Sequence, residues 1–358
     1  MKGLTPTQYG FVFGIYEFGI FILCPVYAKM IPHVSPKFLI CMGLFVAGYC
    51  FSLFGILMWS SPGFNFLTLS IVLRIAASTG AAAFLTGNYS SIAIYFPDHV
   101  SQVFAITETC LGLGMILGPA IGGLLYEISI FCVPFIVMGS LTMLPIIFSI
   151  PIIPEISEEN HEISANRGIL SILSRPQVFL NVSVSFMSFL ILGFNDTTLE
   201  PHLRDFTSLS SVQTGAVFLV SGVSYAIGNQ IWGHFAEDAA MCSKIIVTGI
   251  FFTMIGLIFC GPMFPLPLKP NTFLVVVSQA VLEFGCAAQV VASFKSGILQ
   301  AEKIFHTCDI QTCSIITSLF ASAFSLGLTI GPVIGGVLVG NYGYQRAIIP
   351  LILIHLSM

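Results

Sequence analysis

The sequence has very little charge. Asp, Glu, Lys and Arg make up 8% of its 358 residues, whereas a soluble domain devotes about a quarter of its residues to them. Hydrophobic residues make up 56% of the chain, and the mean hydropathy is +0.97. Such a chain cannot cover a water-facing surface with polar side chains, so a soluble fold is excluded. The net charge of −4 is too small to favour nucleic acid as a partner.

Motifs of catalysis and metal binding are also missing from the sequence. It contains no Walker loop, no GxSxG elbow and no HExxH pattern. Of the ten cysteines, most fall in apolar runs, where cysteine acts as a small hydrophobic residue. Cys308 and Cys313 form the one close pair, without zinc-ligand spacing around it. The sequence therefore predicts no enzyme, no cofactor and no metal, and it predicts free thiols.

Long apolar runs dominate what is present. Runs of about twenty apolar residues are long enough to cross a bilayer as helices, which satisfy their own backbone hydrogen bonds in lipid. We expect such spans near residues 9–28, 38–59, 66–89, 102–127, 131–150, 177–200, 212–233, 245–264, 271–293 and 312–340, with an eleventh, shorter one from Arg346 to Met358. The predicted fold class is an all-α polytopic membrane protein.

The longest polar stretch, residues 151–176, separates five spans from six. We interpret it as a cytoplasmic linker between an N-terminal transmembrane half, residues 1–150, and a C-terminal half, residues 177–358. On the side of the linker the loops carry seven Lys and Arg residues, and on the opposite side they carry four. This bias has the sign expected for a cytoplasmic linker.

One segment is repeated within the chain. Residues 114–123 read GMILGPAIGG and residues 327–336 read GLTIGPVIGG, with six of ten positions identical at a separation of 213 residues. Their small residues leave one helix face bare for close packing, and the proline of each copy bends the helix. We assign structural and gating roles to the shared glycines and prolines, which are Gly114, Gly118, Pro119, Gly122, Gly123, Gly327, Gly331, Pro332, Gly335 and Gly336. Generic small-residue packing is the alternative, but matched copies in two halves are typical of secondary transporters.

These two segments resemble the antiporter signature in the fifth and eleventh helices of the major facilitator superfamily. The loop Gly233-His-Phe-Ala-Glu237-Asp238 is also similar to a loop motif of that family. Within the superfamily the chain is most similar to the vesicular amine transporters, above all to their polyamine-transporting branch. The stretches 108–114, 193–199 and 224–228 carry this similarity. The resemblance implies two pseudo-symmetric six-helix halves, with the first helix missing and the last incomplete, as in a truncated gene model or a shortened isoform.

The resemblance also implies a function. It predicts proton-coupled antiport of a small organic cation, a polyamine or a monoamine, by alternating access. It further implies a monomer in the membrane of a secretory or synaptic-like vesicle, or of another acidic organelle, with lipid, substrate and protons as its partners. Two alternatives stay open: an exporter of another small solute or drug from the same superfamily, and a truncated product that does not transport.

Five charged residues lie in the predicted spans away from the last residue of each span: Glu17, Arg74, Glu108, Asp196 and Glu283. A charged group at bilayer depth costs about 3 kcal/mol on insertion scales, so we expect each of these residues to have a structural or functional role. Four of the five are acids, which suits a cavity for a cation. A carboxyl group in such a cavity exchanges a proton for a cation, and that exchange is the simplest physical basis for antiport.

Asp196 is the first candidate for binding substrate or protons. It lies in the run Gly193-Phe-Asn-Asp-Thr-Thr-Leu and matches an acidic position of the vesicular amine transporters. Glu200, one turn later, is an alternative match, and a helix-end acid facing lumenal water is the alternative role.

The other candidates have weaker support. For Glu17 we weigh a cavity-facing role against a structural pairing. For Glu108 we weigh transport coupling against a hydrogen bond to a neighbouring helix. Glu283 and Tyr225 complete the candidate substrate- and proton-binding set, with interhelical packing as the alternative for Tyr225. Arg74 is assigned a structural role, because it can pair with an acid and hold the N-terminal half together.

Overall fold

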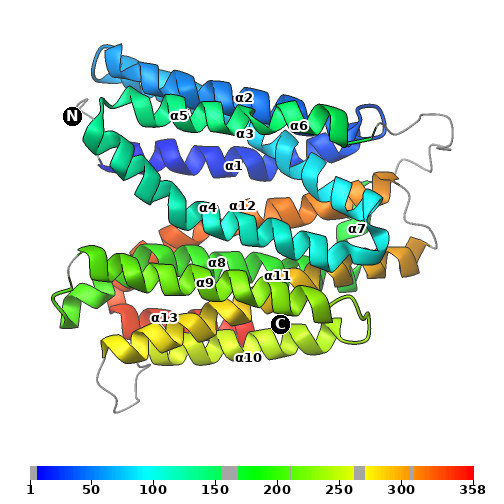
Figure 1. Cartoon of the computed structure of the whole chain (residues 1–358). Coiled ribbons are helices and arrows are strands. Elements are labelled where there is room, and N and C mark those ends of the chain that lie inside the picture. The colour runs from blue at the N-terminus through cyan, green and yellow to red at the C-terminus, as the bar shows by residue number, and fades with distance from the viewer. Residues whose placement is uncertain (1–5, 155–167, 210, 262–270, 306–309) are drawn as a thin grey trace. The chain divides into compact units, whose positions relative to one another are not determined.

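The computed structural model describes residues 6–154, 168–209, 211–261, 271–305 and 310–358 (Figure 1). Over these residues the secondary structure is helical, with no strand. Nine helical segments in the described part are long and apolar enough to cross a membrane. The predicted all-α polytopic fold is confirmed.

Every predicted span corresponds to a helix. The long helices are α1 (Pro6–Met30), α2 (Pro36–Ile56), α3 (Phe64–Tyr95), α4 (Val100–Ile128), α8 (Pro176–Phe206), α9 (Ser211–Phe235), α10 (Cys242–Cys260), α11 (Thr272–Phe305) and α12 (Ile310–Tyr342). The fifth predicted span is divided into α5 (Cys132–Met143) and α6 (Pro145–Ile152), because Pro145 has no backbone N–H to continue the hydrogen-bond ladder. The last predicted span is the shorter α13 (Tyr344–Leu356).

Local sequence signals set several helix ends. Ser35 caps α2 by accepting a hydrogen bond from the backbone N–H of Phe38 at 3.3 Å, and Pro36 follows at the first helical position. Gly343 lies between α12 and α13 with φ of 73°, a backbone conformation that glycine adopts without strain. Most of the predicted linker, residues 155–167, lies outside the described residues; a short helix, α7 (Ile169–Leu173), follows it.

The helices form two compact units. Unit 1 comprises Met1–Tyr95, Pro119–Ile172 and Phe305–Ser325, and unit 2 comprises Phe96–Gly118, Leu173–Ile304 and Leu326–Met358. Both helices that carry the repeated segment change unit along their length, α4 after Gly118 and α12 after Ser325. The first part of each repeated helix therefore packs with helices of the other half of the sequence.

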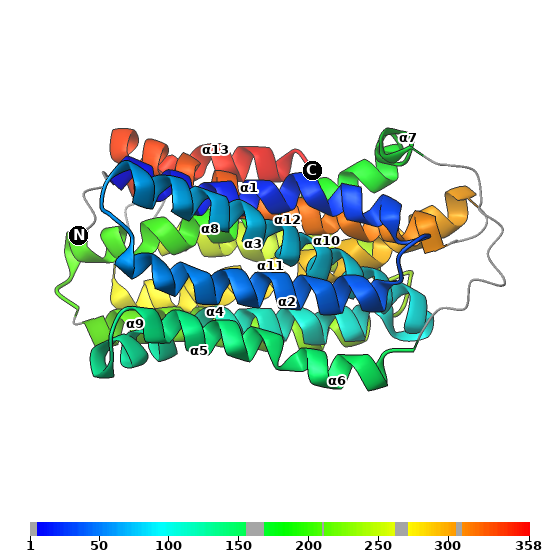
Figure 2. The same cartoon turned by 90° about the horizontal axis from the view of Figure 1, so that it is seen from above.

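Close backbone contacts hold unit 1 together. A methyl group placed on Gly43 of α2 would lie 2.5 Å from the carbonyl oxygen of Gly80 on α3, and one placed on Gly48 would lie 2.6 Å from that of Gly139 on α5. Such distances are possible only where both helices present bare backbone, as membrane helices do at small residues. Figure 2 shows α5 and α6 running along α2.

Unit 2 packs in the same manner around an apolar core. Phe194, Leu257, Leu282 and Ile348 are fully buried in that core and come from α8, α10, α11 and α13. Gly249 of α10 and Gly285 of α11 face each other, so that a methyl on either would lie 2.7 Å from the other's carbonyl oxygen.

The two copies of the repeated segment differ in their surroundings. In the second copy, methyl groups on Gly327, Gly331 and Gly335 would clash with α8, so these glycines allow close helix contact. In the first copy, methyl groups on the four glycines would meet no atom of the described structure within 4 Å; these are Gly114, Gly118, Gly122 and Gly123. Gly336 of the second copy is equally open.

The prediction of free thiols needs one correction. Among the described residues eight cysteines are free, most of them buried in helices, as their place in apolar runs indicated. Cys313, in the first turn of α12, is disulfide-bonded. Cys308, its neighbour in the sequence, lies outside the described residues. Cys313 is as buried as most of the free cysteines, so burial alone does not distinguish a free thiol from a disulfide-bonded one.

Candidate functional site

Asp196 lies in a helix that is otherwise largely buried. The side chains of Phe194, Asn195 and Thr198 are buried, whereas that of Asp196 is exposed. Gly193 contacts Pro332 of α12, and Asn195 bonds to α11. Successive helix residues are turned by about 100°, so Asp196 faces between these two contacts. Because α8 continues from Asp196 to Phe206, Asp196 is an internal residue of the helix and not a helix-end residue.

A buried amide network lies beside Asp196. Asn195 donates to Oε1 of Gln279 at 2.7 Å, and Gln279 donates back to Oδ1 of Asn195 at 2.9 Å. Gln279 also bonds to Sγ of Cys260 at 3.1 Å, and that sulfur lies 3.2 Å from the hydroxyl of Tyr344. Buried polar groups are costly unless they are paired, so the network fixes the register of α8, α10, α11 and α13 around the acid.

Glu283 is the second acid of this region. It lies one turn after Gln279 on α11, on the same helix face, and is 5% exposed. It is close enough to Asp196 for their charges to interact. Within the described residues neither acid forms an ion pair. Two ionised carboxylates near each other repel, and a bound cation relieves that repulsion.

Glu108 and Tyr225 join α4 to α9. The Tyr225 hydroxyl donates to Oε2 of Glu108 at 3.0 Å, and Glu108 is 0% exposed. One residue on, Thr109 donates to the carbonyl of Ala226 at 3.3 Å, and Gln230 donates to Thr109 at 2.8 Å. The first part of α4 is thus bound to α9 by a row of polar contacts.

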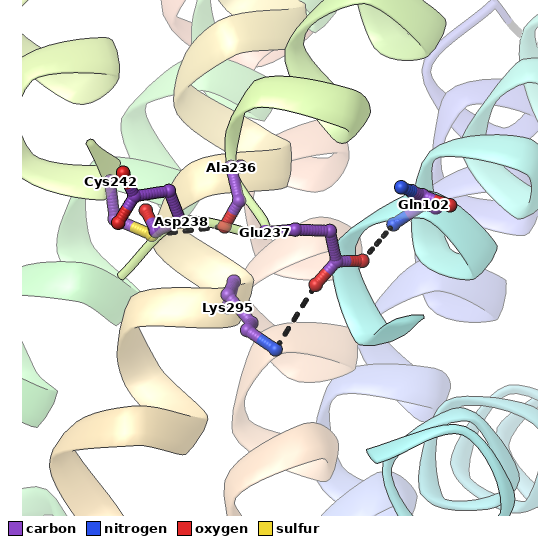
Figure 3. Close-up of polar contacts among 6 residues, drawn as sticks. All are labelled: Gln102, Ala236, Glu237, Asp238, Cys242 and Lys295. Carbon is purple, nitrogen blue, oxygen red and sulfur yellow. Dashed lines mark hydrogen bonds and ion pairs between the residues drawn. The ribbon is translucent and has the colours of Figure 1, made fainter. Parts of the chain in front are cut away.

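Glu237, in the loop between α9 and α10, joins three elements (Figure 3). Its Oε1 accepts from the backbone N–H of Gln102, in the first turn of α4, at 3.0 Å. Its Oε2 lies 3.2 Å from Nζ of Lys295 on α11, whose side chain is 9% exposed. A carboxylate at a helix N-terminus satisfies an unpaired N–H and interacts favourably with the helix dipole.

Glu17 and Arg74 belong to unit 1. The carboxyl group of Glu17 on α1 lies near the Ser325 side chain of α12. The guanidinium carbon of Arg74 lies among three aromatic rings, 4.9 Å from the ring centre of Phe13 and 5.0 Å from that of Phe54. The third ring, Tyr16, is 5.5 Å away. In the described part of the chain Arg74 has no ion pair; aromatic faces surround its charge, and the carboxyl group of Glu17 is close enough to interact with it.

The structure thus groups the candidate residues in three places. Asp196 and Glu283 lie together in unit 2, Glu108 is bonded to Tyr225 in the same unit, and Glu17 lies in unit 1 with Arg74. Glu200, the alternative to Asp196, pairs with Arg204 at 2.5 Å, and both side chains are exposed.

Two further groups of polar residues escaped sequence reasoning. Gln279 is an uncharged residue in an apolar run, and only its position in the middle of a span marked it as unusual. Lys295 is a loop-side cation by sequence but is buried against Glu237. The similarity of the loop 233–238 to a family motif was the sequence signal that could have marked Glu237 as one partner of this ion pair.

The comparison with known families decides the identity of this fold. The sequence profile of the Major Facilitator Superfamily matches residues 2–294. The chain belongs to the Major Facilitator Superfamily. This membership agrees with the resemblance found in the sequence, and it makes the protein a multi-pass membrane transporter and not an enzyme.

Several curated superfamily members are similar to this chain. The MFS-type transporter SLC18B1 of Mus musculus is 29% identical over 347 residues, which cover 97% of this chain and 75% of that protein. The protein of the same name from Homo sapiens is 28% identical with the same coverage. The chromaffin granule amine transporter of Homo sapiens is 24% identical over 303 residues, covering 79% of this chain and 54% of that protein.

Solved structures of superfamily members share the fold. The human organic anion transporter MFSD10 (TETRAN) superimposes with a TM-score of 0.74 at 15% identity, covering 99% of this chain and 85% of that one. FucP in the outward conformation gives the same TM-score and identity, with 99% and 88% covered. At this identity the two structures establish the fold alone.

Proposed function

We propose that this protein is a secondary active transporter that exchanges a small organic cation, a polyamine or a monoamine, for protons. The observation that carries the proposal is the exposed carboxyl group of Asp196, next to the buried Asn195 of α8 and beside the buried Glu283. An acid pair without a basic partner among the described residues attracts a cation. The name of the similar chromaffin granule amine transporter supports the same substrate class and a membrane of that kind of vesicle.

The exchange follows from simple electrostatics. A cation bound at Asp196 and Glu283 neutralises the two carboxylates, and protons from an acidic compartment compete with it for the same oxygen atoms. Release of the cation on the acidic side then needs no energy source other than the proton gradient. Alternating access would come from movement of the predicted halves, residues 1–150 and 177–358, about this site.

Uptake into proteoliposomes tests the proposal. Purified protein is reconstituted with an imposed pH gradient, acidic inside, and uptake of labelled spermidine and of labelled serotonin is followed. The proposal expects uptake of at least one of the two, abolished by an ionophore that collapses the gradient, and inhibited by unlabelled amines. Uptake that is unaffected by the ionophore, or the absence of uptake of either amine by folded protein, contradicts it.

A second candidate function is export of another small solute, namely an organic anion, by the same fold. The observation in its favour is Arg74, a cation in the interior of unit 1 without an ion pair among the described residues. Inhibition by organic anions and not by amines in the same assay would favour this candidate.

A further inference from the structure

The first half of α12 carries a row of hydroxyl groups on one face. Ser314, Thr317, Ser318 and Ser322 are spaced by three or four residues, so they lie on the same side of the helix. None of these four residues is more than 4% exposed. Buried polar residues in membrane spans either hold neighbouring helices together by hydrogen bonds or mark a path for ions or protons.

Helix α3 of the same unit continues the row at the side of the membrane on which the predicted linker lies. The hydroxyl oxygen of Ser90 on α3 lies 3.1 Å from that of Thr317 on α12, and both residues are fully buried. Tyr95, the last residue of α3, donates from its hydroxyl group to the carbonyl oxygen of Pro154 at 3.0 Å. Because Pro154 belongs to the stretch 151–176, this end of the row is on the linker side of unit 1.

The row reaches along α1 to Glu17. Thr86 of α3 donates to the carbonyl oxygen of Cys24 on α1 at 3.4 Å, and Ser322 donates to that of Phe21 at 3.1 Å. Glu17, Phe21 and Cys24 are spaced by four and three residues, so they follow one face of α1. Buried hydroxyl groups therefore extend from the linker side of unit 1 to the level of Glu17. The hydroxyl row, as we call it, comprises Thr86, Ser90, Ser314, Thr317, Ser318 and Ser322.

Two oxygen atoms at the ends of the hydroxyl row are buried without a hydrogen-bond partner among the described residues. They are Oε2 of Glu17 and Oγ of Ser314. Ser314 is 0% exposed and shares its helix face with Thr317. Hydroxyl groups that serve only to hold helices together would all be paired, because an unpaired buried polar group costs free energy. The unpaired oxygen atoms at both ends favour a path along which a proton enters and leaves.

We propose that the hydroxyl row conducts a proton from Glu17 to the linker side of unit 1. The carboxyl group gives its proton to a hydroxyl oxygen, that group passes its own proton on, and the last proton leaves to water on the linker side. Only O–H bonds break and form, and each hydroxyl group both accepts and donates, so the row is restored when the groups turn back. Where two hydroxyl groups lie one helix turn apart, about 5.4 Å, a water molecule bridges them.

The inference deepens the proposed exchange and rests on it for its role in transport. Asp196 and Glu283 hold the cation in unit 2, and Glu17 carries a further proton through unit 1. This proton moves from the acidic compartment to the linker side, down the gradient that drives the exchange.

Other ionisable groups also act on Glu17. Arg74 does so from α3, and Tyr16 and Cys24 lie near it on its own helix. The variants below leave these three residues and Glu17 unchanged. They therefore test the hydroxyl row and not the charges around the acid.

Two substitutions at one position test the path. Thr317→Val keeps the shape of the side chain and removes its hydroxyl group, whereas Thr317→Ser keeps the hydroxyl group. We expect gradient-driven spermidine uptake to fall at least about tenfold in Thr317→Val and to stay within about threefold of the wild type in Thr317→Ser. Exchange of labelled for unlabelled spermidine without a gradient moves no net proton, so it should stay within about twofold of the wild type in both variants. Equal uptake by the two variants, or loss of exchange together with uptake, overturns the inference.

Ser90→Ala and Ser91→Ala form a matched pair on α3. The hydroxyl group of Ser90 meets Thr317, whereas that of Ser91 donates to the carbonyl oxygen of Gly87 in its own helix at 2.7 Å. Gradient-driven uptake should fall in Ser90→Ala and stay at the wild-type rate in Ser91→Ala. The same rate in both variants would contradict the path.

A further measurement does not depend on the transport of an amine. Dicyclohexylcarbodiimide reacts with protonated carboxyl groups, so its attachment to Glu17, read by mass spectrometry in vesicles of one orientation, reports the protonation of this residue. In the wild type the labelling should follow the pH on the linker side, and in Thr317→Val it should no longer do so. Labelling that follows only the pH of the opposite side, or that is the same in both proteins, overturns the path. If the wild type transports no amine but its labelling follows the linker-side pH, the proposed function fails and the path stands.

Discussion

Lys295 and Glu237 form an ion pair of 3.2 Å in which the lysine side chain is 9% exposed and the glutamate side chain 17%. The other carboxylate oxygen of Glu237 binds the first turn of α4 through the N–H of Gln102. One side chain in a loop therefore connects α11 with the start of a helix that carries the repeated segment. The contact lies wholly within unit 2, and its loss should weaken the packing of the first turn of α4 before that of other helices.

Removing one partner of this pair should cost more than removing both. Glu237→Gln leaves a buried ammonium without a counter-charge, and the expected loss is about 1–3 kcal/mol because the pair is partly exposed. Lys295→Met should cost less, since Glu237 keeps its bond to Gln102. The double variant should recover part of the loss. Melting temperatures in detergent measure all three.

Exposed charges on the same helix give the control. Glu302→Gln and Lys303→Met change an acid and a base near Lys295 on α11, and both side chains are exposed. They should alter stability by less than about 0.5 kcal/mol. If the buried and the exposed substitutions lower the melting temperature equally, the Lys295–Glu237 pair does not stabilise the protein more than a surface charge does.

The amide network should matter for the binding of substrate as well as for stability. Gln279→Leu leaves the amide of Asn195 buried and unpaired, at a cost of about 1–3 kcal/mol. Because Asn195 precedes Asp196, we also expect KM for the amine to rise about tenfold as the carboxyl group loses its position. Initial rates of uptake over a range of amine concentrations measure this.

Gln289→Leu is the matched control for Gln279. Gln289 is equally buried on α11 and bonds to Thr253 at 2.7 Å and to Ser188 at 3.3 Å, but it does not touch Asn195. The Gln289→Leu substitution should destabilise the protein to a degree similar to Gln279→Leu, but it should leave the KM for the amine unchanged. A rise of KM in both variants would mean that loss of packing alone, and not the position of Asp196, reduces binding.

The two copies of the repeated segment should respond differently to alanine. Gly331→Ala places a methyl group against the backbone of Leu190 and Phe194 on α8, so the helices must separate and the yield of folded protein should fall sharply. Gly336→Ala, on the same helix, meets open space and should fold normally. Expression followed by size-exclusion chromatography distinguishes them.

Gly118 is the counterpart of Gly331 in the first copy. The Gly118→Ala variant distinguishes a role of this position in helix packing from a role in the movement of the helix during transport. No described atom lies within 4 Å of the added methyl group, so the fold should be unaffected. Slower uptake by a stable Gly118→Ala variant would assign the first copy a role in movement. Unfolding of this variant would contradict the packing described for α4.

Aromatic faces should stabilise Arg74. Phe54→Ala removes a ring 5.0 Å from the guanidinium carbon, and we expect a loss of about 1 kcal/mol beyond that of the apolar contact. Phe45→Ala removes a ring on the same helix that is 54% exposed and serves as the control. In an Arg74→Met background the additional loss for Phe54→Ala should disappear while the effect of Phe45→Ala stays the same, which a double-mutant cycle in detergent measures.

The sequence predicted the number and the limits of most helices, because length and hydropathy dictate them in a membrane. It also singled out the five ionisable residues, since each is conspicuous in an apolar run. It could not show which of them meet. The bond between Glu108 and Tyr225 joins residues 117 positions apart, and helix rotation decides whether a polar side chain faces a neighbour or a cavity.

Arg74 illustrates this limit. From the sequence an acid was the expected partner of a cation in a span, because opposite charges offset the cost of desolvation. The structure places rings from α1 and α2 around Arg74 in addition to Glu17, whose charge is close enough to interact with it. Phenylalanine is so frequent in this chain, with 33 residues, that no pattern in the sequence distinguishes the rings that meet Arg74 from those that face lipid.

The most direct test of this account is gradient-driven spermidine uptake by Asp196→Asn beside the wild type. Asp205→Asn, an exposed acid near the end of the same helix, is the matched control. We expect Asp196→Asn to fall to background, a loss of about a hundredfold or more, because an amide neither attracts a cation nor carries a proton. Asp205→Asn should stay within about twofold of the wild type. Uptake by folded Asp196→Asn at the wild-type rate, still driven by the pH gradient, would contradict the account.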